Sequence, residues 1–190
     1  ELGRIIQDTG PGGSWPCSSD RVIWAVAAWK VYLATGDVQW LRKAYSVVLK
    51  SLESDHHALY DPKTGLYRGE SSFIDWRQQS YPLWMQPADI YMSECLGTNV
   101  VYAKVFETVA SMAGELGKKS VAKEYRGRAA ELRKAINENF WLSDKGYYGS
   151  FLYGRNSLIQ SGRSETLGES LAIRASYKDI FRLPTFNDLY

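Results

Sequence analysis

The chain has 190 residues, of which 45% are hydrophobic, 23% are charged and 14% are aromatic. This composition and length fit one globular domain with a sizeable core. The formal net charge is only +2, so no global field attracts nucleic acid, and we expect no such partner. No apolar run approaches the roughly 20 residues of a membrane span, and we expect no membrane partner either.

Cysteine and histidine are too few for a disulfide framework or a metal centre. Cys17 and Cys95 lack metal-motif spacing, and buried free thiols are the default expectation. The only histidines, His56 and His57, are adjacent at the end of a helical region. We therefore expect no metal and no cofactor.

The first half of the chain predicts a helical hairpin followed by a long connection. A nearly all-apolar helix is expected over residues 20–35, which indicates burial on most of its sides. After a tight turn at Gly36, Asp37 caps an amphipathic helix that runs to about Asp55. A long non-helical stretch over residues 59–93 follows and contains the sequence GESSFIDW.

The second half repeats this order. A mostly apolar helix is expected over residues 98–116 with Thr98 as its cap, and a charged helix over residues 121–140. Another long stretch, residues 141–164, precedes a fifth helix that begins near Glu165.

Repeated helical hairpins must stack or close into a ring, because one hairpin cannot bury its own inner face. If the apolar helices lie inside, each long loop comes at the start of an inner helix, and all long loops share one end. Loops on a rigid scaffold usually carry function. The carboxylates expected at that end are Asp20, Glu70, Asp75, Glu165 and Glu169.

In this order, the segments resemble the six-hairpin glycoside hydrolases, a superfamily that includes trehalases, processing α-glucosidases and α-L-rhamnosidases. The resemblance is carried by residues 15–37, 61–76, 99–117 and 165–173. It implies an all-α fold, the (α/α)6 toroid of six inner and six outer helices. The sequence predicts five helices. Residues 1–190 are therefore expected to form a single, partial catalytic domain, with the remainder of that domain as a partner.

The resemblance also implies hydrolysis of an oligosaccharide or polysaccharide with inversion, in which one carboxylic acid protonates the leaving oxygen and one carboxylate activates water. Asp75 looks like the aspartate that serves as the acid in processing α-glucosidases. Asp20 is the rival, because rhamnosidases place their acid at a comparable helix start. Glu169 completes the catalytic candidates. The general base of the superfamily sits near a late hairpin, and we expect it outside this chain.

Each candidate also has a structural interpretation. Asp75 can be a turn or cap residue, and Asp20 can be a first-turn carboxylate that the helix dipole favours. Arg21 favours the ionised form of Asp20, which suits holding a sugar hydroxyl better than donating a proton. Without the base, Glu165 and Glu169 would bind substrate. Trp76 and Arg77 follow Asp75 where processing α-glucosidases tend to have a small polar pair.

Aromatic side chains in the long loops predict a sugar-binding surface, since flat apolar rings suit the faces of sugars. Glu70 is expected to bind a sugar hydroxyl or to pair with Arg68 or Arg77. The predicted substrate-binding residues are Glu70, Trp76, Arg77, Trp15, Arg21, Trp84 and Glu165. Two other functions remain open, a non-catalytic carbohydrate-binding domain and a helical-hairpin interaction domain. Long loops favour a functional site over the interaction domain.

Overall fold

The computed structural model describes residues 3–5, 19–69, 82–154, 158–164, 168–170 and 172, with the backbone alone at 19–21. The helices are α1 (Ser19–Thr35), α2 (Val38–Leu59), α3 (Pro87–Met92), α4 (Leu96–Glu115) and α5 (Lys119–Phe140). The strands are β1 (Tyr60–Asp61), β2 (Leu66–Tyr67), β3 (Glu94–Cys95), β4 (Trp141–Leu142), β5 (Tyr147–Tyr148), β6 (Phe151–Tyr153) and β7 (Ile159–Gln160). The chain is therefore mostly helical, with short strands.

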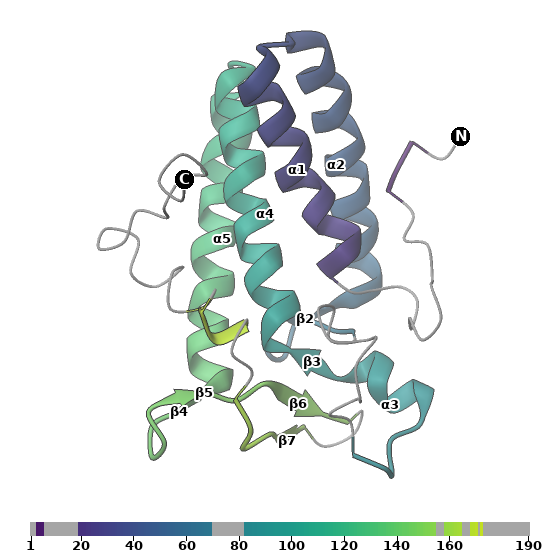
Figure 1. Cartoon of the computed structure of the whole chain (residues 1–190), viewed down its shortest axis with the longest axis vertical. Helices are drawn as coiled ribbons and strands as arrows, with labels where there is room; N and C mark the ends of the chain where they lie inside the picture. Colours follow the sequence, from purple (N-terminus) through teal and green to yellow (C-terminus); the bar gives the residue numbers. More distant parts are fainter. Residues whose placement is uncertain are drawn as a thin grey trace, which may run out of the picture.

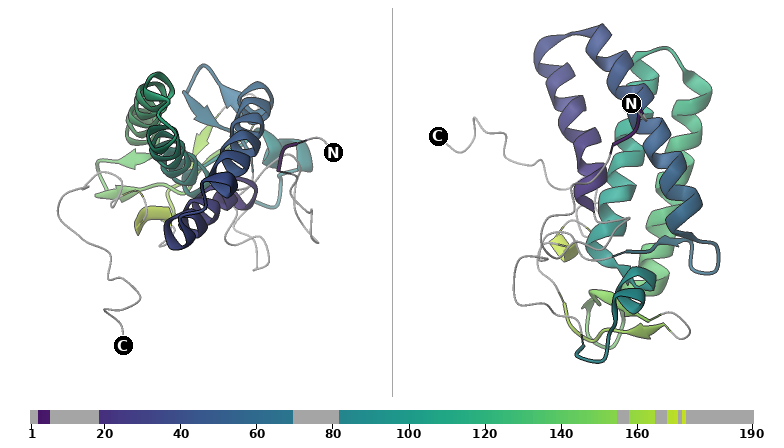
Figure 2. Two further views of the ribbon diagram at one scale, coloured as in Figure 1. Left: turned by 90° about the horizontal axis from the view of Figure 1, so that it is seen from above. Right: turned by 90° about the vertical axis from the view of Figure 1, so that its right-hand side faces the viewer.

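The four long helices form two antiparallel hairpins that lie side by side (Figures 1 and 2). Gly36 ends α1 with φ 67° and Gly117 follows α4 with φ 72°, a left-handed conformation that glycine adopts without strain. The apolar helices α1 and α4 begin at the same end of the bundle, where all the strands and α3 lie. This confirms the expected hairpins and their shared loop end.

The helix boundaries follow local chemistry. Asp37 caps α2 as predicted, because its Oδ1 accepts hydrogen bonds from Gln39 N at 2.8 Å and Trp40 N at 3.0 Å. The predicted cap of α4 is wrong. That helix begins at Leu96 after Cys95, and Thr98 lies fully buried inside it. β3 runs directly into α4, so pairing of the strand sets where the helix begins.

The centre of the core is aromatic. The Tyr67 and Tyr102 rings stack with their centroids 4.2 Å apart, and Phe106 meets both rings edge-on. The Tyr102 hydroxyl donates to Oδ2 of the buried Asp55 at 2.9 Å. These contacts join α2, β2 and α4. Cys95 is buried, as expected.

Three small antiparallel sheets cover the loop end. β1 pairs with β2, β4 pairs with β5, and β3 pairs with β6, which also pairs with β7. In the third sheet Glu94 faces Leu152 and Cys95 faces Phe151, so the segment before α4 is tied to the segment after α5. Neither this sheet nor α3 was expected from the sequence.

Candidate functional site

The loop end of the bundle gathers the described residues that belong to the predicted site. Asp20 and Arg21 lie in the first turn of α1, at this end of the molecule. Trp84 and Glu169 are described with their side chains. The other predicted site residues lie outside the described ranges: Asp75, Glu70, Trp76, Arg77, Trp15 and Glu165.

Trp84 lies in the turn that leads into α3. The turn is closed by a hydrogen bond of 3.0 Å from Met85 N to Pro82 O. The Trp84 side chain is 52% exposed, and its neighbour Leu83 is fully exposed. Met85 instead packs with Phe151 and Tyr153 beneath the turn. An anchored turn thus presents a free indole ring, which is what a sugar-stacking residue needs.

Glu169 is half-buried and held by two donors. Its Oε2 accepts a hydrogen bond from the Ser164 hydroxyl, and its Oε1 accepts one from Tyr148 N at 3.4 Å. The second contact attaches the helical residues 168–170 to β5. Glu169 therefore has a defined place at the loop end, on the side of α5.

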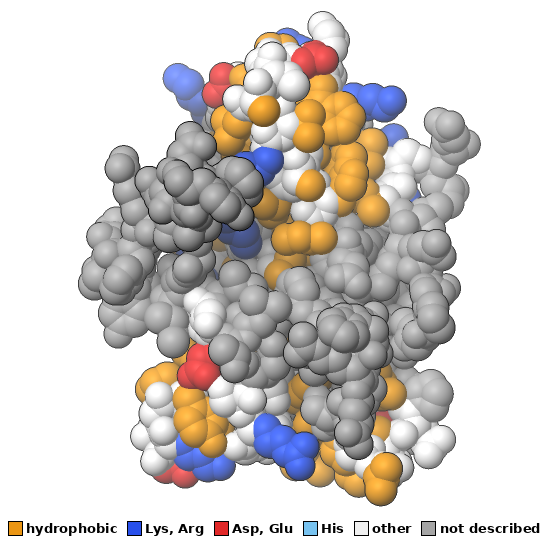
Figure 3. All heavy atoms as spheres, in the orientation of Figure 1, with side chains coloured by type: hydrophobic (Ala, Val, Ile, Leu, Met, Phe, Trp, Pro, Cys, Tyr) orange, Lys and Arg blue, Asp and Glu red, His pale blue; other side chains and the backbone are white. Residues whose placement is uncertain are grey.

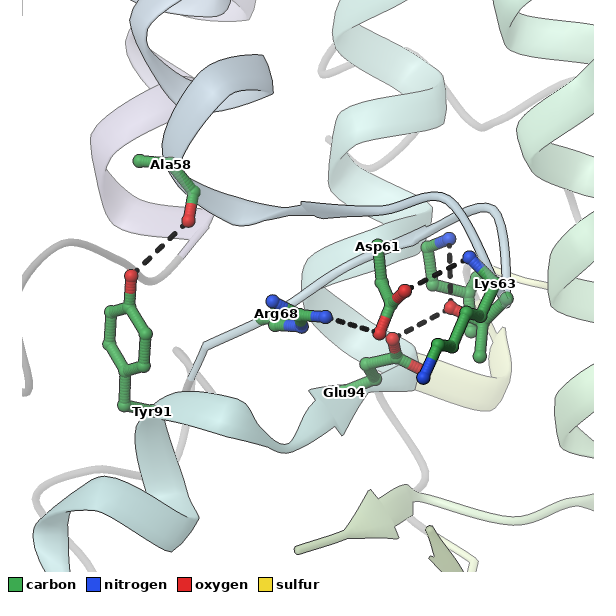
Figure 4. A network of polar contacts seen from close by, with 8 residues as sticks. Ala58, Asp61, Lys63, Arg68, Tyr91 and Glu94 are labelled. Carbon is green, nitrogen blue, oxygen red and sulfur yellow. Dashed lines mark hydrogen bonds and ion pairs between the residues drawn. The ribbon is translucent and has the colours of Figure 1, made fainter. Parts of the chain in front are cut away.

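Sequence reasoning missed a buried carboxyl group between the β1–β2 hairpin and β3, shown in Figure 4. Glu94 has no exposed surface. Its Oε1 accepts a hydrogen bond of 2.7 Å from the Thr64 hydroxyl, and its Oε2 has no partner among the described residues. Burial raises the pKa of Glu94 to about 7, and the nearby Asp61 carboxylate acts in the same direction. Without exposed surface, Glu94 cannot contact a substrate.

Asp61 behaves in the opposite way. Burial alone would raise the pKa of its carboxyl, but hydrogen bonds from Arg68 and Lys63 N outweigh burial and lower the pKa below its usual range. The Arg68 Nη2 atom lies 2.5 Å from Asp61 Oδ2. Sequence reasoning had offered Arg68 as a partner for Glu70. In the structure Arg68 pairs with Asp61, and no cation of the described ranges forms an ion pair with Glu94.

This network fixes the chain that leads into GESSFIDW. The backbones of Arg68 and Glu94 pair in an isolated antiparallel β-bridge, and Gly69 N donates to Ser93 O at 2.8 Å. One step earlier, Asn99 of α4 accepts from Tyr67 N at 2.7 Å and donates to Tyr67 O at 2.9 Å. The residues that immediately precede Glu70 are therefore held against β3 and α4.

The family model of the bacterial α-L-rhamnosidase six-hairpin glycosidase domain matches residues 5–173. The chain belongs to this family. A crystal structure of a GH78 family rhamnosidase of Bacillus sp. GL1 is similar, with a TM-score of 0.63 and 18% sequence identity over 82% of this chain. The match covers 15% of that protein, so the chain spans only a small part of the length of that rhamnosidase. No curated protein matches the sequence of this chain.

Membership in the six-hairpin family accounts for the geometry of the described part. In a toroid of hairpins, apolar helices such as α1 and α4 lie inside and amphipathic helices such as α2 and α5 lie outside.

In this rhamnosidase-family domain, no helix of the described ranges is long and apolar enough to span a membrane. Over the same ranges, no three His, Cys, Asp or Glu side chains form a metal-binding cluster.

Proposed function

We propose that the chain is part of the catalytic domain of an inverting glycoside hydrolase, with an oligosaccharide or polysaccharide that carries α-L-rhamnose as its substrate. The observation that carries this proposal is the family match over residues 5–173. The sugar itself is inferred from the names of the family and of the similar crystal structure.

Asp75 is the proposed proton donor. Its carboxyl proton passes to the glycosidic oxygen as the bond from that oxygen to the anomeric carbon breaks. A water molecule attacks the anomeric carbon from the opposite face and gives its proton to a carboxylate base. Carboxyl groups roughly 6.5–9.5 Å apart leave room for this water. We place the base in the part of the domain beyond this chain.

The other predicted residues bind the sugar in this proposal. Asp20, beside Arg21 at the start of α1, holds a hydroxyl and remains the rival for the acid. The exposed ring of Trp84 supports a stacking role, and the defined place of Glu169 at the loop end supports a hydroxyl contact. Glu70, Arg77 and Glu165 are further polar contacts, and Trp15 and Trp76 are further stacking surfaces.

The test is reducing-sugar release by the longest natural protein that contains this chain, from a panel of aryl glycosides and oligosaccharides that includes α-L-rhamnosides. Asp75→Asn should lower kcat/KM at least 10³-fold, about 4 kcal/mol of barrier, while substrate binding is retained. Asp144→Asn is the matched control, because Asp144 lies exposed in the turn between β4 and β5.

The outcomes separate the candidates. Activity that survives Asp75→Asn but falls with Asp20→Asn would move the acid to α1. Sugar binding without turnover on any substrate would favour the non-catalytic carbohydrate-binding domain.

A further inference from the structure

A hollow of about 460 Å³ lies on the outer wall of the bundle, between α2 and the turn that joins α4 to α5. Its lining residues are Arg42, Tyr45, Ser46, Leu49, Lys50, Leu116 and Lys118. The turn lies at the end of the bundle opposite the small sheets (Figure 1). The hollow is therefore separate from the loop end that carries the proposed catalytic residues.

The hollow is lined by positive charge without a compensating carboxylate. Arg42, Lys50 and Lys118 line it, and no acidic residue of the described ranges does. None of the three forms an ion pair with a described residue. Other cations of the chain do pair: Arg68 with Asp61, and Arg133 with Glu107. Three like charges in one hollow repel one another, and a bound anion would remove this repulsion.

The hollow also contains a hydroxyl donor. Tyr45 is only 6% exposed, lines the hollow, and its hydroxyl has no hydrogen-bond partner among the described residues. Burial raises the pKa of this hydroxyl, with a smaller contribution from Glu124, so it remains a protonated donor. Without a partner in the described part of the chain, this hydroxyl can donate to water or to a ligand in the hollow.

The start of α5 adds to the same field. Lys118 occupies the N-cap position without a side-chain hydrogen bond, and the first turn of the 22-residue helix has no acidic residue. The positive end of the helix dipole is thus left without a negative partner beside the hollow. Lys118 Nζ also lies 5.8 Å from the centroid of the Tyr45 ring, so its ammonium group lies over the face of this ring.

We propose that this hollow binds an anionic group carried by a sugar, through Arg42, Lys50, Lys118 and the Tyr45 hydroxyl. All polar groups that line it can donate, which suits an oxyanion such as a carboxylate or a sulfate. Its volume falls in the range of small-molecule sites, roughly 300–1,000 Å³.

Only the sugar part of this inference rests on the proposed carbohydrate function, because the anion site stands on charge and geometry. The test titrates the Asp75→Asn chain with glucuronate, with glucose as the uncharged counterpart, and with inorganic sulfate, by NMR at low and high ionic strength. Chemical shifts of Tyr45 and Ser46 report on the hollow. Catalysis is not the readout, so failure of the proposed hydrolase activity leaves this test valid.

We expect glucuronate to bind more tightly than glucose, and we expect its affinity to fall as salt is added. Arg42→Gln and Lys118→Gln should each lower its affinity at least tenfold, and Tyr45→Phe severalfold. Lys134→Gln, on an exposed site of α5, is the matched control and should change nothing. Arg42 and Lys118 are exposed, and unchanged thermal unfolding will confirm that these variants fold.

Several results would overturn the proposal. Equal affinities for glucose and glucuronate would show that the hollow does not require an anionic group. Unchanged glucuronate affinity in both Arg42→Gln and Lys118→Gln would show that the anion binds at a different site. Binding of sulfate but not of glucuronate would show that the site takes an inorganic anion and not a sugar. Tighter binding of a glutamate-rich peptide than of an oligoglucuronate would show that the ligand is an acidic protein segment.

Discussion

The helices α1 and α4 are similarly apolar but have different surroundings. Residues 96–103 of α4 are buried without interruption, whereas α1 exposes Ile23, Val31 and Leu33 at 39%, 45% and 57%. α4 packs against both α1 and α5, and β3 and β6 lie at its start. Hydrophobic side chains gather over the upper part of the bundle in Figure 3, where α1 and α2 face the viewer. The same apolar pattern thus marks a helix that is covered and one that is partly open.

This difference has a structural meaning in a ring of hairpins. An inner helix of a toroid has inner-helix neighbours on two sides, and α1 has one, α4, within the described part. Exposed apolar surface of this kind usually marks an interaction site. Since the chain covers 15% of the similar rhamnosidase, we expect another hairpin of the same domain to cover α1.

The largest effect is expected on the covered side, at Phe106 of α4. Its ring is 2% exposed, meets Tyr125 at a centroid distance of 5.8 Å, and carries the Arg128 guanidinium 4.6 Å from its centroid. Phe106→Ala should lower the free energy of unfolding by about 3–5 kcal/mol, since it leaves a cavity and removes these contacts. Urea unfolding measures the loss, and a value below about 1 kcal/mol would mean that α4 is less tightly enclosed than described.

The next effect depends on pH and concerns Glu94, at the entry to α4. Its folded-state pKa of about 7 lies above the ordinary 4.5, so the folded chain holds the proton more tightly than the unfolded chain. The stability from this group is complete below pH 4.5 and falls as pH rises to about 7. The difference corresponds to roughly 3 kcal/mol.

Glu94→Gln keeps the shape and removes the ionisation, so the variant should gain stability relative to the wild type between pH 4.5 and 8. Thermal unfolding across this range measures the gain. The charged groups that face Glu94 are Asp61 and Arg68 of the β1–β2 hairpin, and the Asp61 carboxyl titrates in a lower range. If the melting temperatures of the two proteins changed with pH in parallel, Glu94 would ionise without a loss of stability, and this prediction would be wrong.

A smaller effect is expected at the hydrogen bond between α4 and α2. Tyr102→Phe removes the hydroxyl that donates to Asp55 Oδ2, and both residues are buried. The unfolding free energy should fall by about 1–3 kcal/mol. Tyr91→Phe is the control, because its hydroxyl donates to Ala58 O at 3.2 Å in an exposed position. Equal losses in the two variants would argue against a special role of the buried contact.

The same contrast explains what the sequence could predict. The hairpins were predictable because apolar and amphipathic periods extend over many residues, and Gly36, Asp37 and Gly117 mark the turns. The pairing of β3 with β6 was not, since strands of two and three residues have no period and lie far apart in the sequence. Glu94 gave no signal either, because its burial results from that pairing.

The candidate site shows the same division. The shared end of the long loops was predictable from helix order, and the positions of Asp20, Trp84 and Glu169 there agree with it. The roles of these residues remain predictions, as does that of Asp75, which lies outside the described residues. The unpaired cations around Tyr45 were also hidden, because in the sequence they have the spacing of an ordinary solvated helix face.

The smallest effect is expected on the open side, at Leu33 of α1. Leu33→Gln should change the unfolding free energy of this chain by no more than about 0.5 kcal/mol, because the side chain is 57% exposed. In the longest natural protein that contains the chain, the same change should cost about 1–3 kcal/mol if another hairpin buries this side chain. Lys30→Gln, an exposed polar position on the same helix, is the matched control. Equal small effects of Leu33→Gln in both proteins would mean that α1 stays open in the complete domain, and the apolar character of its outer face would then need a different explanation from ring closure.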